Sequence, residues 1–315
     1  MTIQGKVLTT MWPSRLNEKN RLKSAIQLHA IEVRALPGIV NENALETFAM
    51  QLIASIRRED YYRIIKERSI STYRADPNNS MFDAERAVAY HLQKGNLEEA
   101  CWLIFLMTHF ARPADTGWLR LRDVYGKLGE SIWSWQIVSN TPEVFVQWLT
   151  EKWTCIRGKF GNHRKYESLR PDSNRNIGHV LKSYIELIGI DHTTFFANAV
   201  HEAGNNPTII FDHLYHKMNS VVTFGRLARF DYLALIGRYG IAPIYPGSAY
   251  LSGATGPASG ARLLFLNSTK AAAPISSLQS WLDALNLDID VGMQVMEDAL
   301  CNWQKSPTKF VHFKG

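Results

Sequence analysis

The sequence predicts an all-α fold, and three observations support this prediction. Apolar residues recur at helical spacing through most of the 315 residues. Residues that cap or end helices stand at the edges of these apolar segments. Strand patterns are scarce, because residues 6–10 and 309–313 are the only candidates and both are short. The length allows two modest domains or one large one.

The clearest helix covers residues 177–188. Ile177, Val180, Leu181 and Tyr184 fall at i, i+3, i+4 and i+7, which places them on one face of a helix. Gly189 follows directly and can adopt the left-handed conformation that commonly ends a helix. This segment therefore predicts an amphipathic helix with a defined end.

Two further helices have recognisable starts. Asn96 can cap a helix whose first turn carries two glutamates, where the positive end of the helix dipole favours carboxylates. Its body, residues 100–107, is apolar on every side, which predicts a central position. Thr141 and Pro142 are typical of an N-cap and a first helical position. Other helices are predicted at residues 42–68, 82–94, 116–128, 193–203, 207–219, 224–239, 277–286 and 290–304.

Turn-forming residues divide the chain near Ser80. Residues 75–80 are rich in Asp, Asn, Ser and Pro, so we predict an N-terminal helical extension over residues 1–80 and a helical domain over residues 81–315. Two stretches within this domain depart from the helical pattern. Residues 156–175 are polar and basic, and residues 240–262 are rich in Gly and Pro. The second stretch predicts a hairpin near residues 240–265 between two helices.

Composition narrows the class of protein. With 46% hydrophobic and 20% charged residues the chain is globular, and its net charge of +6 favours a polyanionic partner without establishing one. Cys101, Cys155 and Cys301 lack the spacing of a disulfide framework or a zinc site, which is typical of a reducing cytoplasm. We find no signal peptide, and the longest apolar run is too short to span a bilayer. A cytoplasmic location without a membrane is therefore expected.

The basic stretch carries much of the net charge. Its basic residues outnumber its acidic residues by four. The basic residues are Arg157, Lys159, Arg164, Lys165, Arg170 and Arg175, and the acidic residues are Glu167 and Asp172. Phe160, His163 and Tyr166 are interleaved with them. Two interpretations fit this pattern. The loop can neutralise phosphates and stack on a nucleic-acid base, or it can be an ordinary solvated basic loop.

The Gly-rich stretch also has two interpretations. Gly253 and Gly256 precede a helix that carries Arg262, and Pro257 suits its first turn. Glycines at a helix N-terminus let backbone N–H groups approach a phosphate closely, because no Cβ intervenes. The alternative is an ordinary Gly-rich connection.

Asp231 is the first candidate for a catalytic carboxylate. It follows Arg226 and Arg229 within an apolar helical segment. It can form a structural ion pair, or it can stabilise developing positive charge or activate water. Glu297 and Asp298 form a second acidic candidate, for which a pair on a helix surface is the alternative.

Several motifs resemble those of one protein family. Residues 160–168, 224–233 and 253–265, supported by residues 102–110 and 117–126, are similar to the alpha-glutamyl/putrescinyl thymine pyrophosphorylase family, third clade. The likeness runs from about residue 85 to 266. It implies a fold similar to helix-hairpin-helix DNA glycosylases, in which the hairpin holds the phosphate backbone while a base is flipped out. DNA is accordingly the expected partner, and no obligate protein partner is evident.

The sequence departs from an ordinary helix-hairpin-helix glycosylase in two respects. Its hairpin is about one residue longer, and the next acids after it are Asp283, Asp288 and Asp290, none in the usual context of the catalytic aspartate. The hairpin also lacks the lysine that bifunctional members use for Schiff-base chemistry. Lyase activity is therefore not expected.

The resemblance implies two chemistries, because some related cellular proteins look like defence enzymes that remove hypermodified bases from phage DNA. The family name refers instead to a phage role in building such bases. We favour a monofunctional DNA glycosylase that removes a hypermodified pyrimidine by base flipping in anti-phage defence, without a metal or other cofactor. The alternatives are a transferase that replaces pyrophosphate on a hydroxymethylpyrimidine by an amine and a sensor without turnover.

Each of these functions assigns roles to particular residues. In the favoured hypothesis Asp231 faces C1′, and His163 or Glu167 acts on the leaving base. Glu297, Asp298, Asp288 and Asp290 are the alternative carboxylates. The transferase would use Arg164, Lys165, Arg226 and Arg229 around the diphosphate. The expected DNA-binding residues are Lys159, Arg164, Lys165, Arg226, Arg229, Gly253, Gly256 and Arg262.

Overall fold

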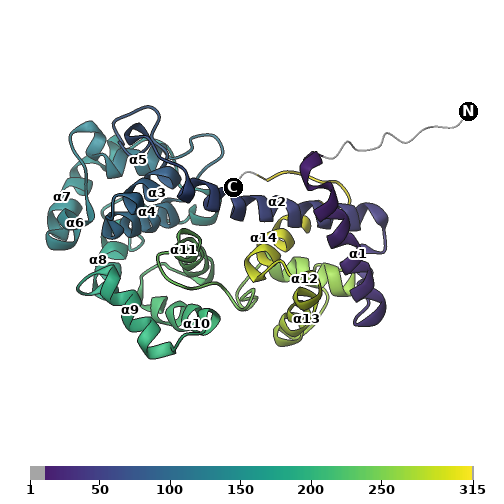
Figure 1. Ribbon diagram of the computed structural model, residues 1–315. Helices are drawn as coiled ribbons and strands as arrows, with labels where there is room; N and C mark the ends of the chain where they lie inside the picture. The colour runs from purple at the N-terminus through teal and green to yellow at the C-terminus, as the bar shows by residue number, and fades with distance from the viewer. Residues whose placement is uncertain (1–10, 314–315) are drawn as a thin grey trace, which may run out of the picture. The chain divides into compact units, whose positions relative to one another are not determined.

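The computed structural model describes residues 11–313 and is all-α (Figure 1). Fourteen α-helices and seven short 3-10 helices account for its regular structure, and the described part of the chain contains no strand. One isolated bridge joins Ser168 to Asn176. The fold class predicted from apolar spacing is therefore confirmed.

The chain forms two compact units. The smaller one combines the N-terminal residues up to Arg58 with Ser248–Phe313, and the larger one contains Glu59–Gly247. The helix α2 (Glu42–Glu67) begins in the smaller unit and ends in the larger one. Residues 59–80 thus belong to the larger unit, so the predicted boundary near Ser80 does not coincide with the division between the units.

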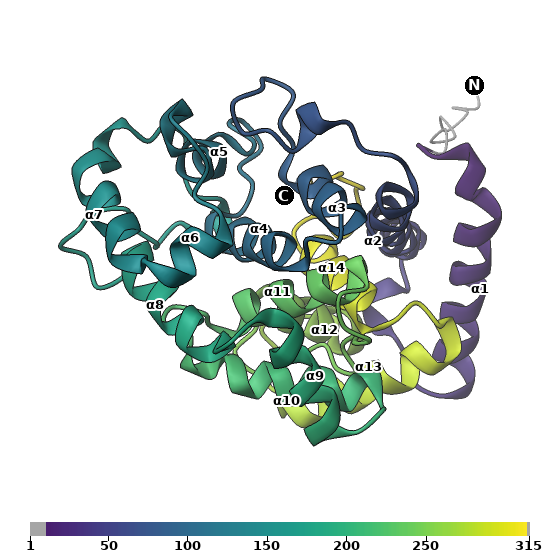
Figure 2. The same ribbon diagram turned by 60° about the vertical axis from the view of Figure 1, so that its left-hand side comes forward.

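The larger unit is built around α4 (Leu97–Phe110), which lies among α3, α5, α6, α9 and α11 (Figure 2). Twelve residues of α4 are buried, because its sequence is apolar on every side, as expected for a central helix. Phe105 stacks on Tyr184 with ring centroids 4.2 Å apart. The other helices are α3 (Ala84–Gln93), α5 (Leu119–Tyr125), α6 (Trp135–Asn140), α7 (Pro142–Lys152), α8 (Ile177–Ile188), α9 (His192–Ala203), α10 (Pro207–Lys217) and α11 (Arg226–Tyr239).

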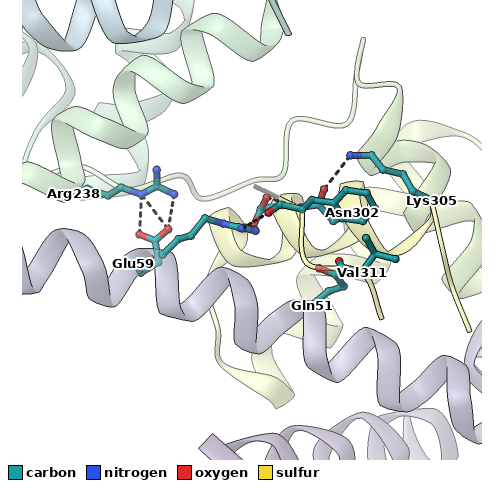
Figure 3. Close-up of polar contacts among 9 residues, drawn as sticks. Gln51, Glu59, Arg238, Asn302, Lys305 and Val311 are labelled. Carbon is teal, nitrogen blue, oxygen red and sulfur yellow. Dashed lines mark hydrogen bonds and ion pairs between the residues drawn. The ribbon is translucent and has the colours of Figure 1, made fainter. Parts of the chain in front are cut away.

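The end of α11 is tied to the part of α2 that lies in the same unit. Arg238 Nε donates to both carboxylate oxygens of Glu59 at 3.0 Å (Figure 3). Tyr239 packs edge-on against Tyr62, with ring centroids 5.3 Å apart. These contacts fix the C-terminal end of α11 and thereby the direction of the whole helix, whose first turns carry the candidate site residues.

The smaller unit packs α12 (Gly256–Leu266) against α14 (Met293–Trp303), with α1 (Leu16–Glu32) on α13 (Ile275–Ile289). The two helices α12 and α14 approach closely because Gly260 has no side chain: a Cβ there would lie 2.4 Å from the carbonyl oxygen of Leu300. The core between the helices includes fully buried Phe48, Leu264 and Trp303. Burial of these side chains holds together two segments that are distant in the sequence.

Most predicted helices are confirmed to within a few residues. Asn96 caps α4, since its side chain accepts a hydrogen bond from the backbone N–H of Glu99 at 3.1 Å. Helix α8 covers the predicted residues, and Gly189 after it has a positive φ of 73°. The sequence pattern did not reveal α1. Two of the four residues that α1 buries, Lys19 and His29, are polar, so the apolar period is broken.

The strand candidate at residues 309–313 is wrong. This segment has no strand partner, and Val311 instead accepts a hydrogen bond at 2.9 Å from the side chain of Gln51 (Figure 3). The other strand candidate, residues 6–10, lies outside the described residues. Among the helices that are described, none combines the length and the apolar character that crossing a bilayer requires.

Candidate active site

The candidate site lies in the larger unit, where three segments meet: the C-terminal end of α4, residues 156–176 and the first turns of α11. The backbone N–H of Gly161 donates to the carbonyl oxygen of Phe110 at 2.8 Å. A Cβ on Gly161 would lie 2.7 Å from that of Ala111, so the loop approaches α4 more closely than any other residue type allows. Phe160 stacks on Phe110 at 5.5 Å between ring centroids. The loop is thus packed against α4.

The start of the loop is also anchored to α5. Arg157 binds the buried carboxylate of Asp123 through its backbone N–H, its Nε and its Nη2, at 3.0, 2.9 and 2.7 Å. Arg120 donates to the carbonyl oxygen of Gly158 at 2.5 Å. Lys159 pairs with Asp115 at 2.7 Å on the surface. Several of the cations that the sequence placed in this loop therefore already have an anionic partner within the protein.

Arg164 lies at the centre of the site and is only 7% exposed. Its Nε donates to the carbonyl oxygen of His109 at 3.4 Å, and its Nη1 donates to that of Thr223 at 3.1 Å. Its Nη2 reaches Thr223 Oγ1 at 3.2 Å and Glu167 Oε1 at 3.5 Å. The guanidinium therefore links the end of α4, the loop and Thr223, which lies shortly before α11, from the inside, whereas the sequence suggested a cation on the DNA-binding surface.

Glu167 is a buried carboxylate, with 1% of its side chain exposed. Its Oε1 accepts a hydrogen bond from Nη2 of Arg175 at 2.5 Å. Its Oε2 has no hydrogen-bond partner within the described protein, and the same holds for Nε of Arg175. A buried carboxylate oxygen without a partner is costly, so the pairing with arginine satisfies only one of the two oxygens of Glu167.

Asp231 lies half-buried on α11 and interacts electrostatically with Arg164. Burial lowers the pKa of Arg164, and the negative charges of Glu167 and Asp231 both oppose this effect. One buried cation thus interacts electrostatically with two carboxylates from different segments. The ion-pair interpretation and the catalytic interpretation of Asp231 are both compatible with this arrangement.

His109 is fully buried beside this cluster. Its ring stacks on Phe105 at 6.0 Å and meets Phe160 edge-on at 5.7 Å. Burial lowers the pKa of His109 well below its usual value, and the positive charges of Arg164 and Arg175 lower it further. Neither ring nitrogen has a hydrogen-bond partner within the described protein. His109 is therefore a neutral imidazole in an aromatic environment.

Two of the predicted site residues are exposed on the same loop. His163 belongs to the short 3-10 helix Asn162–Arg164, and Lys165 follows it directly. The Nζ of Lys165 lies 5.0 Å from the centroid of the Tyr166 ring. The side chains of His163, Lys165 and Tyr166 are exposed, whereas those of Arg164 and Glu167 are buried.

The arginines of α11 lie against aromatic rings. Arg226 lies over Phe230 at 5.0 Å, and Arg229 lies over Tyr215 at 4.2 Å. Arg229 also donates to the carbonyl oxygen of Tyr215 at 3.2 Å and to the side chain of Asn219. Arg229 thus joins α11 to α10, and Arg226 lies one turn closer to the start of α11.

The predicted DNA-binding residues of the hairpin, Gly253, Gly256 and Arg262, belong to the smaller unit. The helix before the hairpin, α11, belongs to the larger unit, and the helix after it, α12, belongs to the smaller one. Gly253 is exposed and has a positive φ of 73°. Gly256 has a packing role, since a Cβ there would lie 2.6 Å from Sγ of Cys301 on α14. Arg262 lines a shallow pocket together with Lys270 and neighbouring residues.

The alternative carboxylates lie in the smaller unit. Asp298 pairs with Arg58 and accepts a hydrogen bond from Asn302 at 2.9 Å, and Asn302 in turn binds Lys305 (Figure 3). Asp288 binds His29 at 2.5 Å. Glu297 is buried, and Asp290 ends α13 in the left-handed conformation. Asp288 and Asp298 therefore have clear structural roles. No group of three or more potential metal ligands occurs among residues 11–313.

The structure adds residues that the sequence did not single out for the site. Thr223, with a positive φ of 64°, turns its carbonyl and hydroxyl oxygens toward Arg164. Arg175 pairs with Glu167, and His109 contributes its carbonyl oxygen. The basic loop and the end of the apolar helix were visible in the sequence. Nothing in the sequence indicated that one arginine would connect them.

Comparison with known proteins identifies one family. The sequence model of the family described as alpha-glutamyl/putrescinyl thymine pyrophosphorylase clade 3 matches residues 43–315. The match covers most of the chain and extends beyond both ends of the segment that carries the resemblance. No curated protein and no solved structure matches the chain significantly.

Proposed function

The chain belongs to the alpha-glutamyl/putrescinyl thymine pyrophosphorylase family, clade 3, and from this membership we infer that it acts on hypermodified thymine bases in DNA. The family name denotes an enzyme of thymine hypermodification. Within this role we propose that the protein is a glycosylase. It releases a modified pyrimidine by hydrolysis of the N-glycosidic bond, and such activity against phage DNA would serve defence.

The observation that supports this proposal is the electrostatic interaction of Asp231 with the buried guanidinium of Arg164. Cleavage of the N-glycosidic bond develops positive charge on the sugar, and an ionised carboxylate close to C1′ stabilises that charge. Asp231 is half-buried, so it is partly shielded from water, and it interacts electrostatically with the guanidinium of Arg164. A carboxylate in this environment is suited to oxocarbenium stabilisation.

The proposed reaction needs only water as a co-substrate. The bond between C1′ and the base nitrogen breaks, the oxygen of a water molecule bonds to C1′, and one proton from that water passes to the departing base. Asp231 orients the water, and His163, which is exposed on the loop, is the candidate for protonating the base. Glu167 is enclosed by Arg164 and Arg175, so we assign it the role of holding Arg164 in place.

The family name itself favours a second candidate function, in which an amine displaces pyrophosphate from a hydroxymethylpyrimidine. This reaction needs cations around a diphosphate. Of the four cations considered, Arg164 is buried and Arg229 binds the backbone of α10, so these two are already engaged within the protein. The geometry of the described residues therefore supports the glycosylase more strongly.

Product analysis distinguishes these functions. The protein is incubated with DNA that carries one bulky modified thymine, and separately with DNA that carries a pyrophosphorylated hydroxymethyluracil together with an amine. Mass spectrometry of a glycosylase reaction detects a free base and an abasic site. A transferase instead yields a base that stays in the polymer with an altered mass, and a sensor yields neither product. Retention of every base by the wild-type protein would contradict the glycosylase.

A further inference from the structure

Lys165 and Tyr166 occupy the two central positions of a tight turn. The backbone N–H of Glu167 donates to the carbonyl oxygen of Arg164 at 2.9 Å, which closes the turn over residues 164–167. The preceding 3-10 helix is closed in the same way, by a bond of 2.9 Å from the N–H of Arg164 to the carbonyl oxygen of Gly161. The backbone on both sides of Lys165 is therefore hydrogen-bonded.

The side chains at the two ends of this turn are buried and fixed. Arg164 is held by Thr223 and by the backbone of His109, and Glu167 is held by Arg175. Arg164 and Glu167 also approach each other, with Nη2 3.5 Å from Oε1. Such a turn loses little conformational freedom when its exposed side chains bind a partner, because both ends are already ordered.

The two central side chains point into solvent. Tyr166 is 70% exposed, more than any other tyrosine, tryptophan or phenylalanine in the described residues. Lys165 is exposed as well, lies 5.0 Å from the ring of Tyr166 and makes no ion pair with the described part of the chain. The neighbouring cations Lys159 and Arg170, by contrast, pair with Asp115 and Asp172. The turn therefore presents an aromatic face together with a cation that has no acidic partner.

We propose that Lys165 and Tyr166 form a nucleobase-binding tip, in which Tyr166 stacks on an unpaired base and Lys165 neutralises an adjacent phosphate. This inference builds on the proposed action on DNA and identifies where the strand is held. An aromatic ring next to a cation that has no acidic partner matches the base face and the phosphate of a single strand. A protein or lipid partner would require a wider apolar patch. The residues that flank Tyr166 in the sequence are instead the exposed Lys165 and the buried Glu167.

Binding of a short single-stranded oligonucleotide with one 2-aminopurine tests the tip, because stacking on Tyr166 quenches or shifts the fluorescence of that base. We expect Tyr166→Ala to weaken binding on the order of 10- to 100-fold and to remove the fluorescence change. Tyr166→Phe keeps the aromatic face and should retain both. Tyr73→Ala is the matched control, since Tyr73 is 58% exposed in the same unit. Melting temperatures of all variants should match that of the wild type.

Two outcomes would overturn the tip. One is a wild-type protein that does not bind the oligonucleotide, and the other is a Tyr166→Ala variant that binds as tightly as Tyr73→Ala. The base-release assay separates this inference from the proposed glycosylase. Loss of binding in Tyr166→Ala with no base release by the wild type supports the tip and contradicts the glycosylase. Normal base release by the wild type together with normal binding by Tyr166→Ala would support the glycosylase and contradict the tip.

Discussion

Half-buried Asp231 interacts electrostatically with buried Arg164, although one belongs to α11 and the other to the basic loop. Arg164 binds Glu167 as well, so the two carboxylates share one buried guanidinium. Arg164 therefore couples the loop that presents Lys165 and Tyr166 to the helix that carries the candidate catalytic carboxylate. Changes at either carboxylate should reveal which of them acts on the substrate.

We expect Asp231→Asn to lower single-turnover base release about 10²-fold or more while the affinity for modified DNA is retained. The amide keeps the shape but removes the charge that stabilises the transition state. Glu167→Gln removes a charge from the same guanidinium, so it is the matched control. Glu167→Gln should lower the melting temperature, and it should reduce base release far less than Asp231→Asn does. Equal losses of activity and stability in both variants would indicate that each carboxylate only holds Arg164.

Lys165→Ala and Arg164→Ala should have different effects on DNA binding. Lys165 is exposed, so its removal should reduce the slope of log K against log salt by about 0.7 to 0.9, as expected for one lost phosphate contact. Arg164 is buried, so Arg164→Ala should leave the slope of log K against log salt nearly unchanged in the fraction of the variant that is folded. It should lower the free energy of unfolding by about 3 to 5 kcal/mol, because two buried acceptors and a carboxylate lose their cation. Salt titrations and urea unfolding measure the two effects.

Gly256 and Cys301 should be energetically coupled in the smaller unit. Gly256→Ala places a Cβ 2.6 Å from Sγ of Cys301, but 3.5 Å or more from the backbone and Cβ of that residue. The single substitution should therefore destabilise the protein, and adding Cys301→Ala should recover much of the loss. A coupling free energy of about 0.5 to 3 kcal/mol is expected from a double-mutant cycle in urea. Purely additive effects would show that the helices α12 and α14 separate to accommodate the methyl group.

Tyr184 should contribute more to stability than Tyr232. The hydroxyl of Tyr184 lies 2.7 Å from Nε2 of His192 and 2.7 Å from the hydroxyl of Tyr232, and Nδ1 of His192 binds Glu98 at 2.5 Å. Tyr184→Phe leaves two buried polar groups without a partner, at a cost of about 1 to 3 kcal/mol for each. Tyr232→Phe leaves the bond to His192 intact. Thermal or urea unfolding in which Tyr232→Phe is the less stable variant would contradict this order.

The stability of the protein should fall as the pH drops below about 6.5, the ordinary pKa of histidine. Burial lowers the pKa of His109 far below that value and lowers the pKa of His91 to about 4. Between those values the unfolded chain binds protons that the folded chain excludes, so acid favours unfolding. We expect His109→Phe to reduce this pH dependence in urea unfolding between pH 5 and 7.5. His201→Ala, at an exposed position on α9, should keep the wild-type slope.

The sequence by itself determined the family and most of the helices, with α1 and α6 as the exceptions. Apolar spacing and caps such as Asn96 depend on neighbours within a few turns, so the order of the elements can be read along the chain. The motifs that carry the family resemblance are likewise contiguous segments. The basic loop was recognised from its composition, and Asp231 was recognised as a carboxylate between arginines and apolar residues.

Only the tertiary structure decided which of these charges are buried and what they contact. Arg164 and Lys165 are adjacent and chemically similar, yet one lies in the interior against His109 and Thr223 while the other faces solvent beside Tyr166. Gly256 lies against Cys301, from which it is distant in the sequence. Burial and pairing depend on contacts between remote segments, and the composition of a loop does not specify which of its side chains will face the helices that pack against it.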